Sequence, residues 1–212
     1  MRKRVECGPH PLNVIPIPGD GRRHVGRLET VLHRQWAPGT VPPQSIRDII
    51  DGFANLPSHL AERLADEVDG IYVGEGSVVD LDHMGHLRGV RTDPDDPHSR
   101  PFDRLAGIYR YGVMALGSLP HESISLVLHE TGHVLDIADQ MMSETREWRD
   151  LHKACLPLLE NPYWHKRHEW WAEAFALTAS DGFEVLDDML AGDTGLAYDV
   201  TRYFEDNYGV MA

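Results

Sequence analysis

The sequence predicts a single mixed α+β domain, with short strands among its first 120 residues and a helical C-terminal half. Three observations lead to this class. The chain has 212 residues, 42% of them hydrophobic and 25% charged, which is typical of one globular domain with its own core. Runs rich in β-branched and aromatic residues occur at 71–81 and 108–116. After residue 120, apolar residues recur mainly at helical spacing.

The elements follow in order along the chain. The first 44 residues are poorly determined, with glycine and proline turns around one short helix at 25–36. Residues 46–53 and 60–68 have the apolar spacing of two helices. Residues 71–81 predict a β-hairpin or two nearby strands, 92–101 a loop, and 108–116 one further strand. We therefore divide the chain into an N-terminal segment, residues 1–44, and a domain, residues 45–212.

Composition excludes several functional classes. With 34 acidic and 20 basic residues, the net charge of -14 would repel a nucleic acid backbone. No apolar run approaches the roughly 18 residues of a membrane span. The basic N-terminus continues into polar residues, so no Sec signal peptide is evident, and we expect a cytoplasmic protein or export by a non-Sec route. Cys7 and Cys155 form neither a disulfide framework nor a CxxC motif, and Cys155 has the spacing of a core residue.

The motif that carries chemistry is HETGH at residues 129–133, an instance of HExxH. Residues four apart share one face of a helix, so His129 and His133 can bind the same metal ion. Glu130 lies beside that ion and can take a proton from a metal-activated water. Apolar residues flank the motif, which indicates a buried helix rather than a surface helix with two stray histidines. Gly132 is costly in such a helix, and a tight packing contact would explain it.

A second helix offers the third ligand that a catalytic zinc site requires. In HEWWAEAFA at residues 168–176, Glu169 and Glu173 are spaced i,i+4 on one face. Ala172 and Ala176 are small enough to let this helix approach another one closely. We therefore expect the two acids to meet the two histidines.

The segments HETGHVLD and EWWAEAF resemble the HExGHxxD and ExxAExF signature of the anthrax lethal factor catalytic domain and its relatives, which include the Pro-Pro endopeptidases. The likeness covers roughly residues 45–180. It implies a zincin-like fold and a zinc-dependent endopeptidase of the gluzincin type. It further implies that His129, His133 and Glu169 bind zinc, that Glu130 is the general base, and that Glu173 supports the ligands from behind.

Two further residues are assigned from the same resemblance. The family places a tyrosine seven residues before the ligand glutamate to stabilise the oxyanion, and here Pro162 holds that position while Tyr163 is the nearest match. Asp136 either orients an imidazole or faces solvent. Glu173 as the ligand in place of Glu169 remains an alternative.

We expect the substrate to be a protein or peptide bound as an extended strand, since such peptides add to the exposed edge of a sheet. The strand at 108–116 precedes the motif and is the natural edge, with residues 117–120 bordering the cleft. The acidic chain favours basic or neutral peptides. The sequence does not indicate an oligomeric state.

Two other functions fit parts of the pattern. Intracellular regulatory peptidases of the ImmA/IrrE type also pair HExxH with a later ExxAxxFA helix and cleave repressors, although their Leu-rich, Pro-ended tail is absent after Ala176. A non-catalytic binding protein could also keep a zincin fold. Replacing Glu130 distinguishes an enzyme from such a binding protein.

Overall fold

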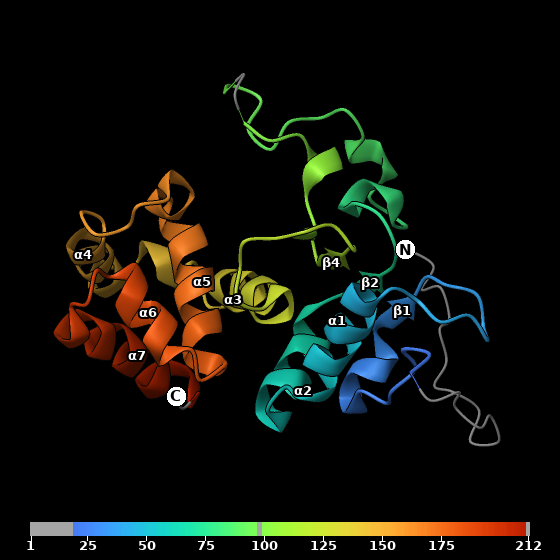
Figure 1. Ribbon diagram of the computed structural model, residues 1–212, viewed down its shortest axis with the longest axis horizontal. Helices are drawn as coiled ribbons and strands as arrows, with labels where there is room; N and C mark the ends of the chain where they lie inside the picture. Colours follow the sequence, from blue (N-terminus) through green and yellow to red (C-terminus); the bar gives the residue numbers. More distant parts are fainter. Residues whose placement is uncertain (1–18, 97–98, 211–212) are drawn as a thin grey trace. The chain divides into compact units, whose positions relative to one another are not determined.

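The computed structural model describes residues 19–96 and 99–210 (Figure 1). It has two compact units, Met1–His121 and Glu122–Ala212, here called the N-terminal and C-terminal units. The described residues contain seven α-helices and a four-stranded mixed sheet, so the predicted α+β class with a helical C-terminal half is confirmed. The division expected at residue 44 stays a prediction, and residues 1–18, including Cys7, lie outside the described part.

The N-terminal unit is built on a sheet of strand order β1-β2-β4-β3. Strands β1 (Leu32–Arg34), β2 (Gly70–Val73) and β4 (Val113–Leu116) are parallel, and β3 (Gly107–Arg110) pairs antiparallel with β4. Its helices are α1 (Gln44–Ala54) and α2 (Ser58–Glu67). β3 is therefore an edge strand.

Both faces of the central strands are buried. Tyr72, Val113 and Ala115 pack into one cluster with apolar residues of the 78–105 segment, including Met84 and Phe102. Because side chains alternate along a strand, the neighbouring positions point to the opposite face, where Ile71, Val73, Met114 and Leu116 are also fully buried. The sheet is thus the centre of this unit rather than a cover on one side.

The helix predictions at 46–53 and 60–68 are confirmed by α1 and α2, whose inward positions are buried. Residues 92–101, expected to be a loop, contain no helix or strand among those described. The two helices are predicted from strong apolar periodicity, and the loop is predicted from the absence of such periodicity.

Three other predictions for this unit are wrong. Residues 25–36 form a 3-10 helix, Gly26–Thr30, followed by β1. Residues 71–81 contain β2 and a 3-10 helix, Val78–Asp80, whose capping box closes with Ser77 and Asp80, so they are not a hairpin. Residues 108–116 are two strands, because Tyr111 and Gly112 adopt positive φ angles of 51° and 78° and reverse the chain.

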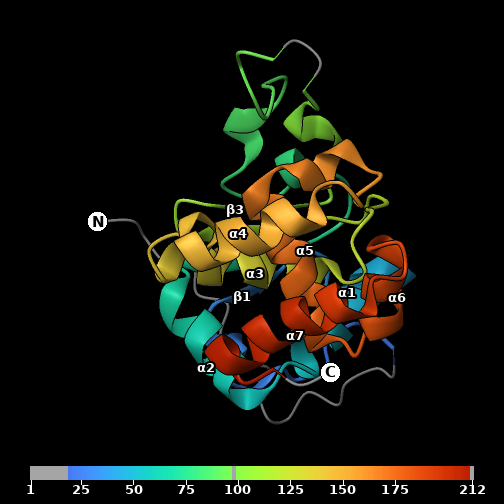
Figure 2. The same ribbon diagram turned by 90° about the vertical axis from the view of Figure 1, so that its left-hand side faces the viewer.

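The C-terminal unit is helical: α3 (Leu126–Ala138), α4 (Arg146–Cys155), α5 (Arg167–Ala179), α6 (Phe183–Met189) and α7 (Thr194–Tyr208). Both views show α3 lying against α5, the pair that contains the two sequence motifs (Figures 1 and 2). None of the helices in the described ranges combines the length and the apolar character needed to cross a membrane.

An aromatic cluster from three helices holds this unit together. Trp148 of α4 and Trp171 of α5 are fully buried and contact aromatic rings of α7. Cys155 is also fully buried, and burial raises the pKa of its thiol to about 12. Its thiolate is therefore disfavoured, which agrees with the core role expected from its spacing.

Candidate metal centre

The HExxH motif lies in the middle of α3. The side chain of Ser125 caps the helix by accepting a hydrogen bond from the backbone N–H of Leu128. His129 and Glu130 are buried, with 5% and 4% of their surface exposed, while His133 is partly exposed. One end of the motif therefore remains accessible within this unit.

Gly132 sets how closely α3 approaches α5. A Cβ atom on Gly132 would lie 2.9 Å from Cα and 3.2 Å from Cβ of Ala172. Neither atom can move unless the backbone of α5 moves with it. The tight contact inferred from a mid-helix glycine is thus present, and the small residue that it meets is one of the two alanines singled out in the second helix.

Three donor atoms converge at this contact. The Nε2 atoms of His129 and His133 lie 3.4 and 3.3 Å from the same oxygen, Oε2 of Glu169. The ligand atoms of all three residues fall within 4.8 Å of one another. Two imidazoles and one carboxylate are a donor set that zinc prefers. The residues therefore fit a zinc ion, and His129, His133 and Glu169 would hold it.

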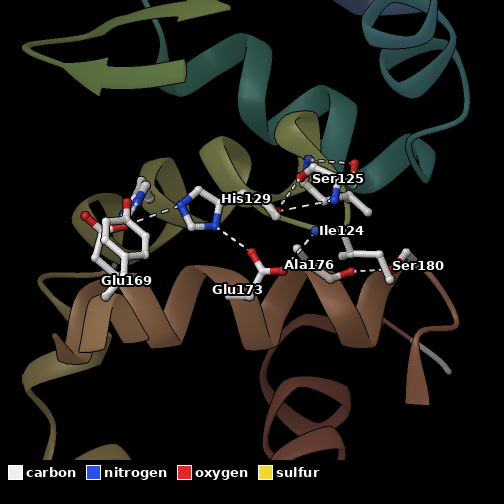
Figure 3. Close-up of polar contacts among 11 residues, drawn as sticks. Ile124, Ser125, His129, Glu169, Glu173, Ala176 and Ser180 are labelled. Carbon is white, nitrogen blue, oxygen red and sulfur yellow. Dashed lines mark hydrogen bonds and ion pairs between the residues drawn. The ribbon is translucent and has the colours of Figure 1, made fainter. Parts of the chain in front are cut away.

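Glu173 lies behind the site and contacts His129 (Figure 3). Its Oε2 is 3.0 Å from Nδ1 of His129, and its Oε1 accepts a hydrogen bond from the backbone N–H of Ile124 at 2.9 Å. An ionised carboxylate only accepts, so Nδ1 must carry the proton and Nε2 is the nitrogen that faces Glu169. Glu173 thus fixes the tautomer that a metal ligand needs.

Glu169, and not Glu173, offers an oxygen to both imidazoles. This geometry matches the ligand set implied by the resemblance. It gives Glu173 the supporting position instead, one helical turn further along α5.

The carboxylates around His129 favour a positive charge at the site. Burial by itself would lower the pKa of His129, but hydrogen bonds to Glu169 and Glu173 and the charge of Glu130 outweigh it and raise the pKa to about 10. For Glu169, burial would raise the pKa, but hydrogen bonds from His129, His133 and His168 hold it well below its usual range. Without a metal, a proton on His129 therefore offsets part of the negative charge of the carboxylates, and a divalent cation can replace it.

Tyr163 lies close to the proposed ligands. Its hydroxyl donates a 2.6 Å hydrogen bond to Oε2 of Glu169, the same oxygen that faces both imidazoles. It belongs to a 3-10 helix, Pro162–His165, which Asn161 caps. This short helix brings the phenol to the site although it stands one position later than the resemblance predicts.

Asp136 has a different place from either alternative considered for it. It is buried, and its two oxygens accept hydrogen bonds from the backbone N–H and the hydroxyl of Ser143 at 2.6 and 2.7 Å. These hydrogen bonds thus join Asp136 to the segment after α3 and not to the imidazoles. It closes the turn that leads from α3 to α4.

His168 also lies close to the proposed ligands. Its Nε2 is 3.5 Å from Oε1 of Glu169, and its ring centre is 6.0 Å from that of His133. His165 instead contacts the backbone carbonyl of Leu159. In the sequence, His168 is distinguished only by its position directly before the proposed ligand glutamate. Any residue at that position would lie in the first turn of α5, so the position alone does not indicate a functional role.

Comparison with known proteins gives a structural match. No described protein family and no curated protein sequence matches the chain. Among solved structures, a Pro-Pro endopeptidase from Paenibacillus alvei is similar, with a TM-score of 0.65 and 18% sequence identity over 84% of this chain and 99% of that one. The chain thus shares the fold of that endopeptidase.

Proposed function

We propose that this protein is a zinc-dependent endopeptidase that hydrolyses peptide bonds of a protein substrate. The observation that carries the proposal is the convergence of His129, His133 and Glu169 within 4.8 Å, with Glu130 next to the first ligand in the chain. The similarity of fold to a Pro-Pro endopeptidase supports the same reaction class.

When bound, zinc supplies Lewis acidity that polarises the scissile carbonyl and acidifies water at the site. Glu130 acts as the general base: it takes a proton from the attacking water and gives it to the leaving amine. Glu130 is buried, so the proton that it carries is shielded from bulk water during the transfer. Glu173 keeps His129 in the tautomer whose Nε2 can bind a metal.

Tyr163 is our candidate for stabilising the tetrahedral intermediate. In the structure its hydroxyl donates to Glu169. That oxygen would be taken up by a metal, which would release the phenol O–H to donate to a developing oxyanion. The role requires the hydroxyl and not the ring, so Tyr163→Phe isolates it.

We infer that the substrate is a peptide segment in extended conformation. β3 is an edge strand of a mixed sheet, and edge strands offer backbone donors and acceptors to a further strand. The net charge of -14 favours basic or neutral segments. We expect the protein to act in the cytoplasm or after export by a non-Sec route.

The test is Glu130→Gln, which removes the base while keeping the shape of the side chain. Zinc content is measured by elemental mass spectrometry. Cleavage is measured with a peptide library derived from a proteome. We expect zinc to be retained and cleavage to fall by about 10³-fold or more. Glu205→Gln, an equal change of charge at an exposed position of α7, is the matched control and should leave both unchanged.

Three outcomes separate the alternatives. Cleavage by the wild type that survives Glu130→Gln refutes the proposed mechanism. Zinc without cleavage in either protein, across libraries of folded and unfolded substrates, indicates a non-catalytic protein with a zincin-like fold. Cleavage restricted to a transcriptional repressor would instead indicate a regulatory peptidase of the ImmA/IrrE type.

A further inference from the structure

A pocket lies in the N-terminal unit, where β3 turns into β4, and it shares no residue with the metal centre. Its volume is about 250 Å³, and it is lined by His83, Met84, His86, Arg110, Tyr111 and Val113. Three of these side chains carry N–H groups, one carries a hydroxyl, and none is acidic. The pocket therefore offers donors and a positive charge in a chain whose net charge is -14.

Arg110 carries the permanent positive charge of the pocket. Its guanidinium lies over the ring of Tyr111 at 4.9 Å and over that of Phe102 at 5.7 Å, and it donates a hydrogen bond of 3.3 Å to the Tyr111 hydroxyl. Among the described residues it forms no ion pair. Contacts with the two rings help to place the guanidinium without neutralising its charge, and its remaining N–H groups are left for a ligand.

Two residues of the pocket adopt a backbone conformation that side chains disfavour. Tyr111 and His83 have φ angles of 51° and 67°. Tyr111 occupies the first position of a two-residue hairpin turn, where Asn or Gly would be free of strain. Strained residues of this kind concentrate at binding sites, where a side chain is held in place at a conformational cost.

The two histidines complete the polar rim. Nδ1 of His86 lies 3.0 Å from the carbonyl oxygen of His83, so Nδ1 carries a proton and the opposite nitrogen, Nε2, is left for other partners. The ring of His83 contacts that of Tyr72, with the ring centres 5.0 Å apart. The buried side chains of Met84 and Val113 supply an apolar base.

We propose that this pocket binds an oxyanion, a carboxylate or phosphate group carried by a small molecule. The planar fork of Arg110 matches two oxygens of such a group, and the Tyr111 hydroxyl, which already accepts from Arg110, can donate to a third position. A divalent cation is disfavoured because the pocket has a guanidinium and no carboxylate. The apolar base would contact the hydrocarbon part of the ligand.

The experiment is an NMR titration of the full chain with its histidine rings labelled with carbon-13, using inorganic phosphate in one arm and propionate in the other. We expect saturable shifts of two histidine signals, those that His83→Gln and His86→Gln each remove, in at least one arm. The tighter arm identifies the group. Arg110→Gln should weaken binding at least tenfold, while Arg202→Gln, the same change of charge at an exposed position of α7, should change it less than twofold.

Shifts that rise linearly without saturation in both arms, or equal binding by Arg110→Gln, overturn the proposal. If Arg110→Gln fails to fold, Arg110→Lys decides: it keeps the charge but loses the planar fork, and we expect at least a threefold loss of affinity. The proposal goes beyond the peptidase function. Glu130→Gln should therefore bind the anion as the wild type does, whether or not the wild type cleaves peptides.

Discussion

The contact between Gly132 and Ala172 makes a quantitative prediction about both stability and metal binding. A Cβ at residue 132 would lie 2.9 Å from the Ala172 Cα and 3.2 Å from its carbonyl oxygen, so Gly132→Ala forces α3 and α5 apart. Overpacking of this kind costs about 1–3 kcal/mol. Alanine regains roughly 1 kcal/mol of helix propensity, and because the clash is with backbone we expect the upper part of the range. The free energy of unfolding should fall by about 1–2 kcal/mol.

The same displacement should weaken zinc binding, because the two imidazoles are on α3 and Glu169 is on α5. We expect a loss of affinity of about tenfold or more, as for other changes that disturb ligand placement. Urea unfolding of the zinc-free protein gives the first quantity, and competition with a zinc-binding dye gives the second.

Gly195→Ala is the matched control. Gly195 is also helical, and a Cβ there would meet nothing nearer than 3.5 Å, an ordinary contact. We expect this variant to be neutral or slightly stabilising, with unchanged zinc affinity. If Gly132→Ala behaves like Gly195→Ala in both assays, the close approach of the two helices is not what positions the ligands.

Further predictions concern single groups at the site. Glu173→Gln can no longer accept from both Ile124 and His129, so zinc affinity should fall about 10- to 100-fold in dye competition. In the zinc-free protein the pKa of His129 is raised from 6.5 to about 10. The protonated imidazole therefore stabilises the fold fully below pH 6.5, and this stabilisation is lost as the pH rises to 10. Urea unfolding in the presence of a chelator, at several pH values, measures the loss. Tyr163→Phe should keep zinc and lower kcat on a cleavable peptide by about 100-fold or more. Asp136→Ala, which leaves the buried donors of Ser143 unpaired, should lower the free energy of unfolding by about 2–4 kcal/mol and leave the zinc affinity of the folded protein unchanged.

The parts of the fold that the sequence predicts correctly are those with strong periodicity. A helix is the only element that fits the apolar spacing of 46–53, and the four apolar residues of this segment are all buried in α1: Ile46, Ile49, Ile50 and Phe53. The strands are short, and their ends depend on turns. Tyr111 takes a positive φ that its residue type disfavours, so a hairpin could not be distinguished from one strand. Residues 78–80 are β-branched at two positions, but the capping box of Ser77 and Asp80 favours a 3-10 turn.

The candidate site follows from the sequence to the extent that helix geometry determines it. Spacing within each motif brings His129 and His133 to one face of the first helix, and Glu169 and Glu173 to one face of the second. The small residues Gly132 and Ala172 indicate that these two faces meet. What spacing cannot give is rotation about the helix axes. Spacing therefore left open which glutamate faces the imidazoles, and it could not show that Asp136 accepts hydrogen bonds from Ser143.

The central claim is that His129, His133 and Glu169 form a zinc site. The most direct test is zinc per chain by elemental mass spectrometry, on protein purified without added metal and again after adding zinc and removing the excess. Our account predicts about one zinc in the wild type and none in His133→Ala, with Glu205→Gln, a change at an exposed position of α7, as a folded comparison that keeps the metal. Less than a tenth of an equivalent in the wild type after zinc addition, or equal zinc in His133→Ala, would contradict it.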